Sequence, residues 1–274
     1  DEKTGDGSCY RYEYDAMDHR IRTTDPLGNV FATPHDTAGR LAMEVNPNTY
    51  DPATKSGQGV RYEYDTDDRR TKVIYPDGGV RRLKYDSMGR LVKVIEPEQY
   101  DPQTDDGSGY TYRYDAAGRL EEIVNPDGAV GKRYVYNLRG LVVKEISAEG
   151  YLAGDTDEAR IGTMHRYNAA GWLLETREPV SRAKDGTVQY RLTQYAYDAN
   201  GNRTEEKRFL SFQNAESAKG SIHTLTFDYD KQNRLVRVSD GLGAVVRYEY
   251  DGLNRRTRET RVLSEGLTQR LDYN

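Results

Sequence analysis

Cysteine, tryptophan, phenylalanine and histidine are scarce in this 274-residue sequence, which holds one Cys, one Trp, four Phe and four His. The lone Cys9 excludes an intrachain disulfide and a structural zinc site built from several thiolates. Nucleophile-elbow, phosphate-loop and dinucleotide-binding motifs are missing, so we expect no catalytic residue and no cofactor. The histidines match no metal-binding spacing, so we expect structural roles for His19, His35, His165 and His223.

Long hydrophobic runs are missing as well. Hydrophobic residues make up 35% of the chain, the mean hydropathy is −0.93, and no stretch approaches the ~18 apolar residues of a transmembrane helix. We therefore expect no membrane span and no thick apolar core, and residues 1–30 have no signal-peptide pattern. Disorder is not indicated, because 23 tyrosines raise the aromatic content to 10%.

Charges of the two signs are nearly balanced. The chain has 40 Lys and Arg against 45 Asp and Glu, which gives a net charge of −5, and the two signs are mixed along the whole sequence. Because no basic stripe is present to neutralise phosphates, we expect no nucleic-acid partner.

A Tyr-Asp or Tyr-Asn dipeptide recurs along the chain at intervals of 21 to 32 residues, with His35-Asp36 filling one gap. Such self-similarity is typical of a repeat architecture, so we treat the tyrosines as structural repeat anchors. The anchors are Tyr14, Tyr64, Tyr85, Tyr114, Tyr136, Tyr167, Tyr197, Tyr229, Tyr250 and Tyr273. The aspartates that follow are Asp15, Asp65, Asp86, Asp115, Asp198, Asp230 and Asp251.

The residues after each anchor predict a tight turn. Asp or Asn suits the first position of a type I turn, where its side chain can bond the turn backbone. Four residues after the tyrosine comes a Gly, Asn or Asp, the types that best tolerate the left-handed conformation closing a bulged hairpin. The glycines there are Gly39, Gly89, Gly118, Gly140, Gly171 and Gly201, with Asp18, Asp68, Asn233 and Asn254 elsewhere.

The residues before each turn alternate in polarity, as in a half-buried strand. Tyr110, Tyr112 and Tyr114 share one face, and Thr111 and Arg113 share the other. A Pro-Asp-Gly turn or a variant of it follows the second strand, as at residues 125–128. We predict about 20 short antiparallel strands, with one helical turn at most, at residues 155–160. Residues 91–95 carry apolar side chains on both faces, which a strand covered on both sides would explain.

The run Tyr-x-Tyr-Asp-x-x-Gly-Arg-Leu followed by Pro-Asp-Gly resembles the signature of the YD-repeat, or RHS (rearrangement hotspot), family. The resemblance is clearest at residues 112–120 with 126–128 and covers roughly residues 10–274. It implies a long β-ribbon that spirals into a hollow shell, as in bacterial toxin-complex B and C components, RHS effectors, wall-associated proteins and teneurins. In the toxins this shell encloses a C-terminal toxic domain. The paired Asp-Pro-x-Gly motifs linked to self-cleavage are not seen here.

We therefore predict an all-β fold of consecutive antiparallel β-hairpin repeats that form a continuous curved ribbon or spiral sheet. Residues 1–274 are expected to be a single array of about ten repeats, and a fragment of a longer protein. A thin wall depends on cross-strand side-chain pairs, and tyrosine offers a large ring with a hydroxyl that can stay wet. We expect successive anchor tyrosines to stack in columns along the wall.

An acidic loop at residues 101–107 has spaced carboxylates before a glycine, as calcium loops do. Its internal counterpart at residues 51–57 keeps Asp-Pro, Thr and Gly but loses both later acids. Because the turn chemistry persists while the acids do not, we expect no metal site.

These patterns predict a non-enzymatic structural module, part of a hollow β-shell that encapsulates or carries a toxin or effector domain encoded elsewhere in a secreted or cell-surface bacterial protein. The partners would be that cargo or neighbouring repeats. The alternative is a cell-surface adhesion or carbohydrate-binding module, since tyrosines can stack on sugars, and no ligand-binding residue is assigned. Exposed sheet edges would also permit self-association.

Overall fold

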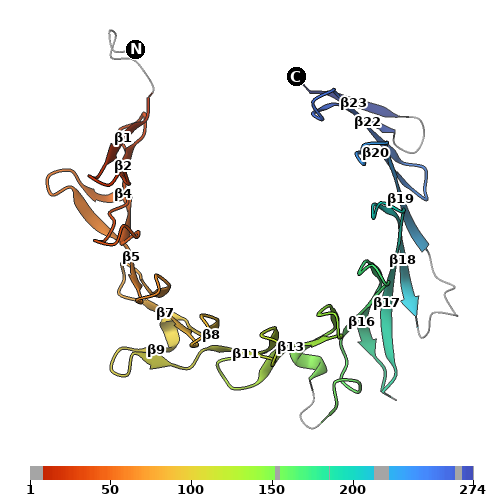
Figure 1. Ribbon diagram of the computed structural model, residues 1–274, viewed down its shortest axis with the longest axis horizontal. Coiled ribbons are helices and arrows are strands. Elements are labelled where there is room, and N and C mark those ends of the chain that lie inside the picture. The colour runs from red at the N-terminus through yellow and green to blue at the C-terminus, as the bar shows by residue number, and fades with distance from the viewer. Residues whose placement is uncertain (1–8, 152–154, 185, 213–221, 263–266, 274) are drawn as a thin grey trace. The chain divides into compact units, whose positions relative to one another are not determined.

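A computed structural model of the chain describes residues 9–151, 155–184, 186–212, 222–262 and 267–273. The chain divides into an N-terminal unit of residues 1–129 and a C-terminal unit of residues 130–274. Both units consist almost entirely of β-strands, drawn as arrows in Figure 1. No helix in the described part of the chain is long and apolar enough to cross a membrane.

The strands of the N-terminal unit are β1 (Arg11–Tyr14), β2 (Arg20–Thr24), β3 (Val30–Ala32), β4 (Met43–Asp51), β5 (Ser56–Tyr64), β6 (Arg70–Ile74), β7 (Val80–Tyr85), β8 (Leu91–Ile95), β9 (Tyr100–Asp101), β10 (Asp106–Gly107), β11 (Tyr110–Tyr114) and β12 (Leu120–Val124), with a 3-10 turn η1 (Pro97–Gln99).

Those of the C-terminal unit are β13 (Val130–Tyr136), β14 (Val142–Ser147), β15 (Thr163–Tyr167), β16 (Leu173–Arg182), β17 (Val188–Tyr197), β18 (Arg203–Phe212), β19 (Ile222–Tyr229), β20 (Leu235–Asp240), β21 (Val245–Tyr250), β22 (Arg256–Val262) and β23 (Thr268–Asp272), with a 3-10 turn η2 (Ala148–Gly150).

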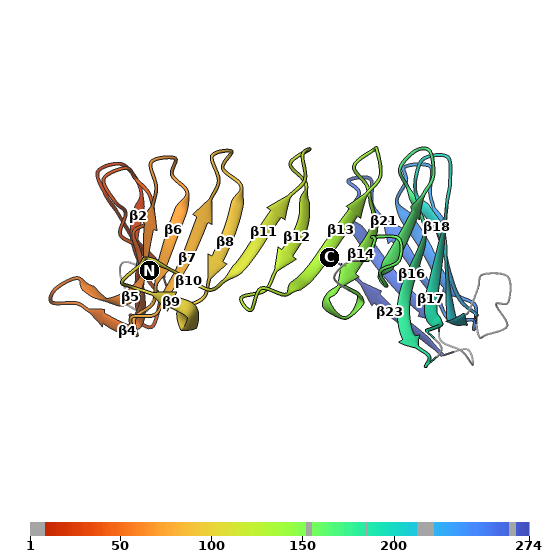
Figure 2. The same cartoon turned by 90° about the horizontal axis from the view of Figure 1, so that it is seen from below.

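Each unit is a meander of consecutive antiparallel strands. In the N-terminal unit β1 to β8 pair in chain order and β8 then pairs with β11, while β9 and β10 form a separate small ladder. In the C-terminal unit β13 to β23 pair in chain order. The predicted all-β fold of successive hairpins is therefore confirmed. Figure 2 shows the turns between β7 and β8 and between β11 and β12 at the same edge of the sheet.

The alternation seen in the sequence sets the register of each hairpin. In the β11–β12 pair Tyr112 faces Ile123, and the next residue, Arg113, faces Glu122 on the opposite side of the sheet. Arg113 Nη1 donates to Glu122 Oε2 at 2.7 Å. A slip of one residue would bring charged and apolar side chains to the wrong faces, so these pairs fix the register.

The buried core is small, and its two fully buried side chains, Ile95 and Ile146, lie where a long connection approaches the sheet. Val94 and Ile95 are 3% and 0% exposed although they point to opposite faces, so β8 is covered on both sides. Residues 96–109 run back over Ile95, and a Cβ atom on Gly109 would lie 2.9 Å from Ile95 Cγ1. The same arrangement recurs in the C-terminal unit, where Gly162 approaches the fully buried Ile146.

Residues 155–160, where the sequence allows one helical turn, form a hydrogen-bonded turn without becoming a helix. The carbonyl oxygen of Thr156 accepts hydrogen bonds of 3.1 Å from the backbone N–H groups of Ala159 and Arg160. The two 3-10 turns lie instead at the start of the long connections, η1 after β8 and η2 after β14.

Candidate functional site

Strands end at the anchor tyrosines, and the turn after each tyrosine follows one design. The last residues of β1, β5, β7, β11, β13, β15, β17, β19 and β21 are Tyr14, Tyr64, Tyr85, Tyr114, Tyr136, Tyr167, Tyr197, Tyr229 and Tyr250. The tenth anchor, Tyr273, directly follows β23, and its partner Asn274 lies outside the described residues.

The hairpin turn of residues 85–90 illustrates the chemistry. Asp86 Oδ1 accepts hydrogen bonds of 2.9 Å from the N–H groups of Met88 and Arg90. Gly89 closes the turn with a φ of 80° and donates its N–H to the carbonyl oxygen of Asp86 at 3.0 Å. The bond from the Arg90 N–H, with others, holds the pKa of Asp86 below its ordinary value.

The closing residue has a positive φ in the other turns too, so the predicted bulged turn is confirmed. The residues concerned are Asp18, Gly39, Asp68, Gly118, Gly140, Gly171, Gly201, Asn233 and Asn254.

An arginine four residues after the turn aspartate completes the turn, a role the sequence analysis did not assign. Arg90 Nε donates to Asp86 Oδ2 at 2.7 Å. The same ion pair recurs as Asp36–Arg40, Asp65–Arg69, Asp115–Arg119, Asp230–Arg234 and Asp251–Arg255. The available signal was the arginine after glycine in the repeated motif.

The hydroxyl groups of seven anchor tyrosines tie their hairpins to the preceding ones. Tyr114 Oη donates to the carbonyl oxygen of Leu91, the residue after Arg90, at 2.7 Å. Burial raises the pKa of Tyr114, so the phenol remains a donor. Equivalent bonds join Tyr64 to Leu41, Tyr85 to Arg70, Tyr167 to Val142, Tyr197 to Leu173, Tyr229 to Arg203 and Tyr250 to Leu235.

The arginine also covers the ring of that next tyrosine. Arg90 Cζ lies 4.5 Å from the centroid of the Tyr114 ring. Similar contacts of 4.7 to 5.1 Å pair Arg40 with Tyr64, Arg69 with Tyr85 and Arg234 with Tyr250. We call such a set of turn aspartate, arginine and next anchor tyrosine a lock; Asp86, Arg90 and Tyr114 form one.

The expected columns of stacked tyrosines must therefore be corrected. Consecutive anchors lie two strands apart, about 9.5 Å at ordinary strand spacing, whereas stacked rings need centroids within about 7 Å. The side chain just before the intervening strand fills the gap, and it is usually arginine. Trp172 takes that place beneath Tyr197, with ring centroids 5.4 Å apart.

The first lock has a different composition. Asp15 is followed by His19 in the arginine position, and His35 stands in the tyrosine position. His19 Nδ1 lies 3.1 Å from Asp15 Oδ2, and the two imidazole rings stack with centroids 4.8 Å apart. The sequence shows no metal-binding spacing for these histidines, but equivalent repeat positions bring them together. Asp15, His19 and His35 form a group that could hold a metal ion.

The acidic loop considered for calcium forms ion pairs with the sheet that it covers. Asp105 contacts Lys72 and Arg82, at 3.1 and 3.3 Å. Lys84 and Lys93 bond Asp106 and hold its pKa well below its usual range. These carboxylates therefore fasten the long connection to the sheet.

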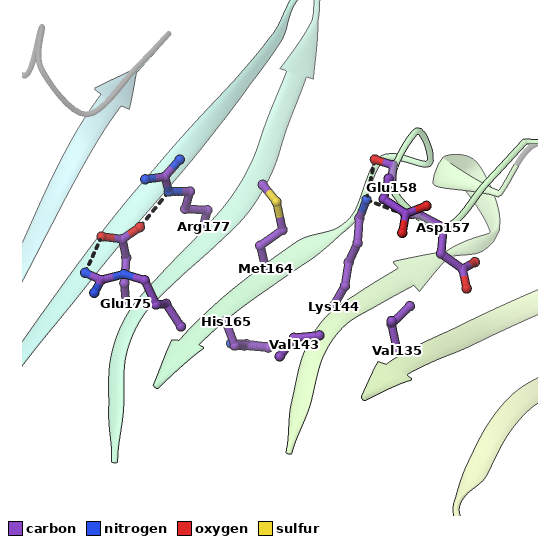
Figure 3. Close-up of a pocket in the computed structure, with 10 residues that line it drawn as sticks. Val135, Val143, Lys144, Asp157, Glu158, Met164, His165, Glu175 and Arg177 are labelled. Carbon is purple, nitrogen blue, oxygen red and sulfur yellow. Dashed lines mark hydrogen bonds and ion pairs between the residues drawn. The ribbon is translucent and has the colours of Figure 1, made fainter. Parts of the chain in front are cut away.

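A recess of about 530 Å³ lies on the C-terminal unit, on the face covered by residues 155–160. Figure 3 shows Met164 between Lys144 and Arg177, which the strand register places in one row with Val135. Lys144 Nζ donates to the carbonyl oxygens of Asp157 and Glu158, and burial lowers the pKa of Lys144.

The wall of this recess is charged but paired. Glu175 is buried and accepts hydrogen bonds from Arg177 Nε at 2.6 Å and from Arg166 Nη2 at 3.3 Å. The recess thus has a short apolar surface beside charged groups that already have partners. Such a surface suits packing contacts more than proton transfer.

Three segments of the chain match the model of a known repeat family. Residues 64–101, 103–130 and 229–265 match the model of the RHS repeat. No curated protein sequence matches the chain.

Solved structures give the fold. The crystal structure of TcdB2-TccC3 is similar with a TM-score of 0.57 and 14% identity, over 97% of this chain and 15% of that one. That of TcdB2-TccC3-Cdc42 has a TM-score of 0.55 and 14% identity, over 98% of this chain and 15% of that one. This chain therefore spans about 15% of the length of the chains that it matches.

Proposed function

We propose that residues 1–274 are one repeat array that forms a stretch of wall in a larger β-shell, because three segments of the chain match the RHS repeat. The wall would enclose or carry a toxin or effector domain encoded elsewhere in a secreted or cell-surface bacterial protein. The lock is the observation that supports this proposal, because its recurring polar side chains join one hairpin to the next.

The energies of the lock fit a wall that lacks a thick core. A hydrogen bond such as that from Tyr114 to Leu91 contributes about 1 kcal/mol, and a cation–π contact such as that of Arg90 on Tyr114 adds about 0.5–1 kcal/mol. Repetition lets such small terms accumulate along the sheet, as in other repeat proteins whose stability is a sum over neighbouring units.

We propose further that this segment is not an enzyme. The buried carboxylate of Glu175 is held by Arg166 and Arg177, and that of Glu206 is held by Arg203 and Arg208. Carboxylates paired in this way are held by ionic hydrogen bonds, which suits packing between strands more than acid–base catalysis.

Protease protection in the full protein that carries this array tests the proposal. We expect the enclosed domain to survive digestion in the native protein and to be cut after Arg90→Ala with Tyr114→Leu, which removes one lock. Leu138→Ser changes a fully exposed turn residue and should leave protection intact. Equal digestion of that domain in the native protein and the lock variant would contradict encapsulation.

A second candidate function is carbohydrate binding. Two exposed tyrosines favour it, Tyr12 in β1 and Tyr10 just before that strand. Tyr10 and Tyr12 are 59% and 48% exposed, and their rings are nearly parallel with centroids 6.4 Å apart. Retention of the chain on a glycan array, lost with Tyr10→Ser and Tyr12→Ser, would support this function. No retention would leave the wall as the sole proposal.

Self-association is proposed from the edge strands. Among the described residues β1 pairs only with β2, and β23 pairs only with β22. Unpaired backbone groups at such edges attract further strands. Light scattering of the purified chain should therefore give a mass that rises with concentration, and a constant monomer mass would contradict the proposal.

A further inference from the structure

The first lock has side chains that suit metal binding in place of the arginine and tyrosine of the other locks. In most of the other turns an arginine follows the turn aspartate and can bridge it to the next tyrosine, as Arg40 does between Asp36 and Tyr64. In the first lock imidazoles occupy both the arginine and the tyrosine positions, so a guanidinium, which cannot bind metals, and a phenol are replaced by two ligands that metals favour.

The three candidate ligands already lie close together. One ligand atom from each of Asp15, His19 and His35 lies within 4.8 Å of the other two, and all three side chains are half-buried. Tetrahedral coordination at about 2.0–2.2 Å places ligand atoms about 3.3–3.6 Å apart, so closure needs the ligand atoms to approach by about 1 Å or slightly more. Such shifts lie within the reach of side-chain rotation.

His35 lacks the hydrogen bond that a tyrosine makes at its position. The equivalent backbone acceptor, the carbonyl oxygen of Arg20, is bonded by Thr33 Oγ1 at 2.8 Å. His35 Nδ1 is buried and has no hydrogen-bond partner. A buried nitrogen left unpaired is costly, and a metal ion would satisfy it.

A cavity of about 370 Å³ borders both Asp15 and His35 and gives an ion and its water ligands access. Two cationic side chains also line this cavity. Arg22 is ion-paired with Glu13, and Lys55 is exposed, so its ammonium group can turn to solvent when an ion enters.

We propose that Asp15, His19 and His35 bind a divalent transition-metal ion, with zinc the best suited. Two imidazoles and one carboxylate with a water molecule complete a tetrahedral zinc site, whereas calcium and magnesium prefer oxygen ligands. Imidazole nitrogens donate in the ring plane, so one ring turns out of the present stack on binding. The ion would clamp the β1–β2 hairpin to the turn that follows β3.

Metal titration of the full 274-residue chain, stripped with chelator and dialysed, tests this site. We expect isothermal titration with zinc chloride at pH 7.5 to give one ion per chain, and cobalt(II) to give the visible absorption of a tetrahedral site. The double variant His19→Arg with His35→Tyr installs the lock found at Asp36, Arg40 and Tyr64, so it should fold. Its zinc affinity should fall about 100-fold or more.

Two control variants exclude other sources of binding. His223→Gln removes a histidine of the C-terminal unit, and Cys9→Ser removes the lone exposed thiol; both should bind zinc as the unaltered chain does. The proposal is overturned if the unaltered chain binds no zinc, if the double variant binds as tightly, or if Cys9→Ser abolishes binding.

Discussion

The hydroxyl group of Tyr114 donates a 2.7 Å hydrogen bond to the carbonyl oxygen of Leu91, which lies 23 residues earlier in the chain. This bond joins the end of β11 to the start of β8 and is repeated by other anchor tyrosines. It gives the RHS repeat a defined link between hairpins beyond the ladder hydrogen bonds, and its strength can be measured.

Tyr114→Phe removes only this hydroxyl. We expect a loss of about 1 kcal/mol in the free energy of unfolding, because the ring and its contact with Arg90 remain. Urea unfolding followed by circular dichroism measures the change. Tyr110→Phe on the same strand is the matched control, since Tyr110 is exposed, and it should change stability by less than about 0.5 kcal/mol. Equal losses in the two variants would contradict the role of the hydroxyl bond.

Arg90 and Tyr114 should be energetically coupled. A double-mutant cycle with Arg90→Lys and Tyr114→Leu should give an interaction energy of about 0.5–1 kcal/mol, because lysine keeps the charge but loses the planar stack on the ring. The free energies of unfolding of the four proteins supply the cycle. The same cycle with Arg113 in place of Arg90 is the control, since Arg113 points to the opposite face of the sheet; additive effects at Arg90 would refute the coupling.

Gly109→Ala should destabilise the N-terminal unit by about 1–3 kcal/mol, because the added methyl group meets the carbonyl oxygen of Val94 and lies 2.9 Å from Ile95 Cγ1. Gly252→Ala is the matched control, since nothing lies within 4 Å of its Cβ position. That variant should keep or slightly raise stability. Thermal unfolding compares the two, and an unchanged midpoint for Gly109→Ala would show that residues 96–109 do not press on the sheet.

Asp106 should make stability depend on pH in the acid range. Its pKa is lowered in the folded chain by Lys84 and Lys93, so the stabilisation is complete above the unfolded value of about 3.9 and is lost as pH falls below that value toward the folded pKa. Asp106→Asn should be less stable than the unaltered chain at pH 7, and the difference should shrink as the pH falls from 4 toward 2.

Unfolding midpoints measured from pH 7 to pH 2 follow this difference. The control is Asp127→Asn, whose carboxylate bonds only the N–H of Ala129 within its own turn. That variant should track the unaltered chain across the range. A constant gap between Asp106→Asn and the unaltered chain would mean that the carboxylate charge is not what stabilises the fold.

The strands and turns could be predicted because their chemistry is local. Asp86 bonds residues two and four positions later, and Gly89 must adopt a positive φ, so a few residues specify the turn. The alternation of Tyr112 and Arg113 then assigns the faces of β11.

The lock was beyond sequence reasoning because its parts come from different hairpins. Arg90 fills the space beneath Tyr114 because of the spacing between strands. This relationship is apparent only once the register is known. For the same reason the sequence alone does not bring His19 and His35 together, although His35 fills a tyrosine position. Aligning the arginine position across repeats would have placed His19 opposite His35.

The hydroxyl bonds of the anchor tyrosines all point backward along the sequence. Tyr85 needs Arg70, Tyr114 needs Leu91 and Tyr197 needs Leu173, so the acceptor is always synthesised before the donor. A hairpin leaving the ribosome therefore finds its docking surface already made by the hairpin before it. Within each unit the order of translation is also an order in which the sheet can be completed, one hairpin at a time.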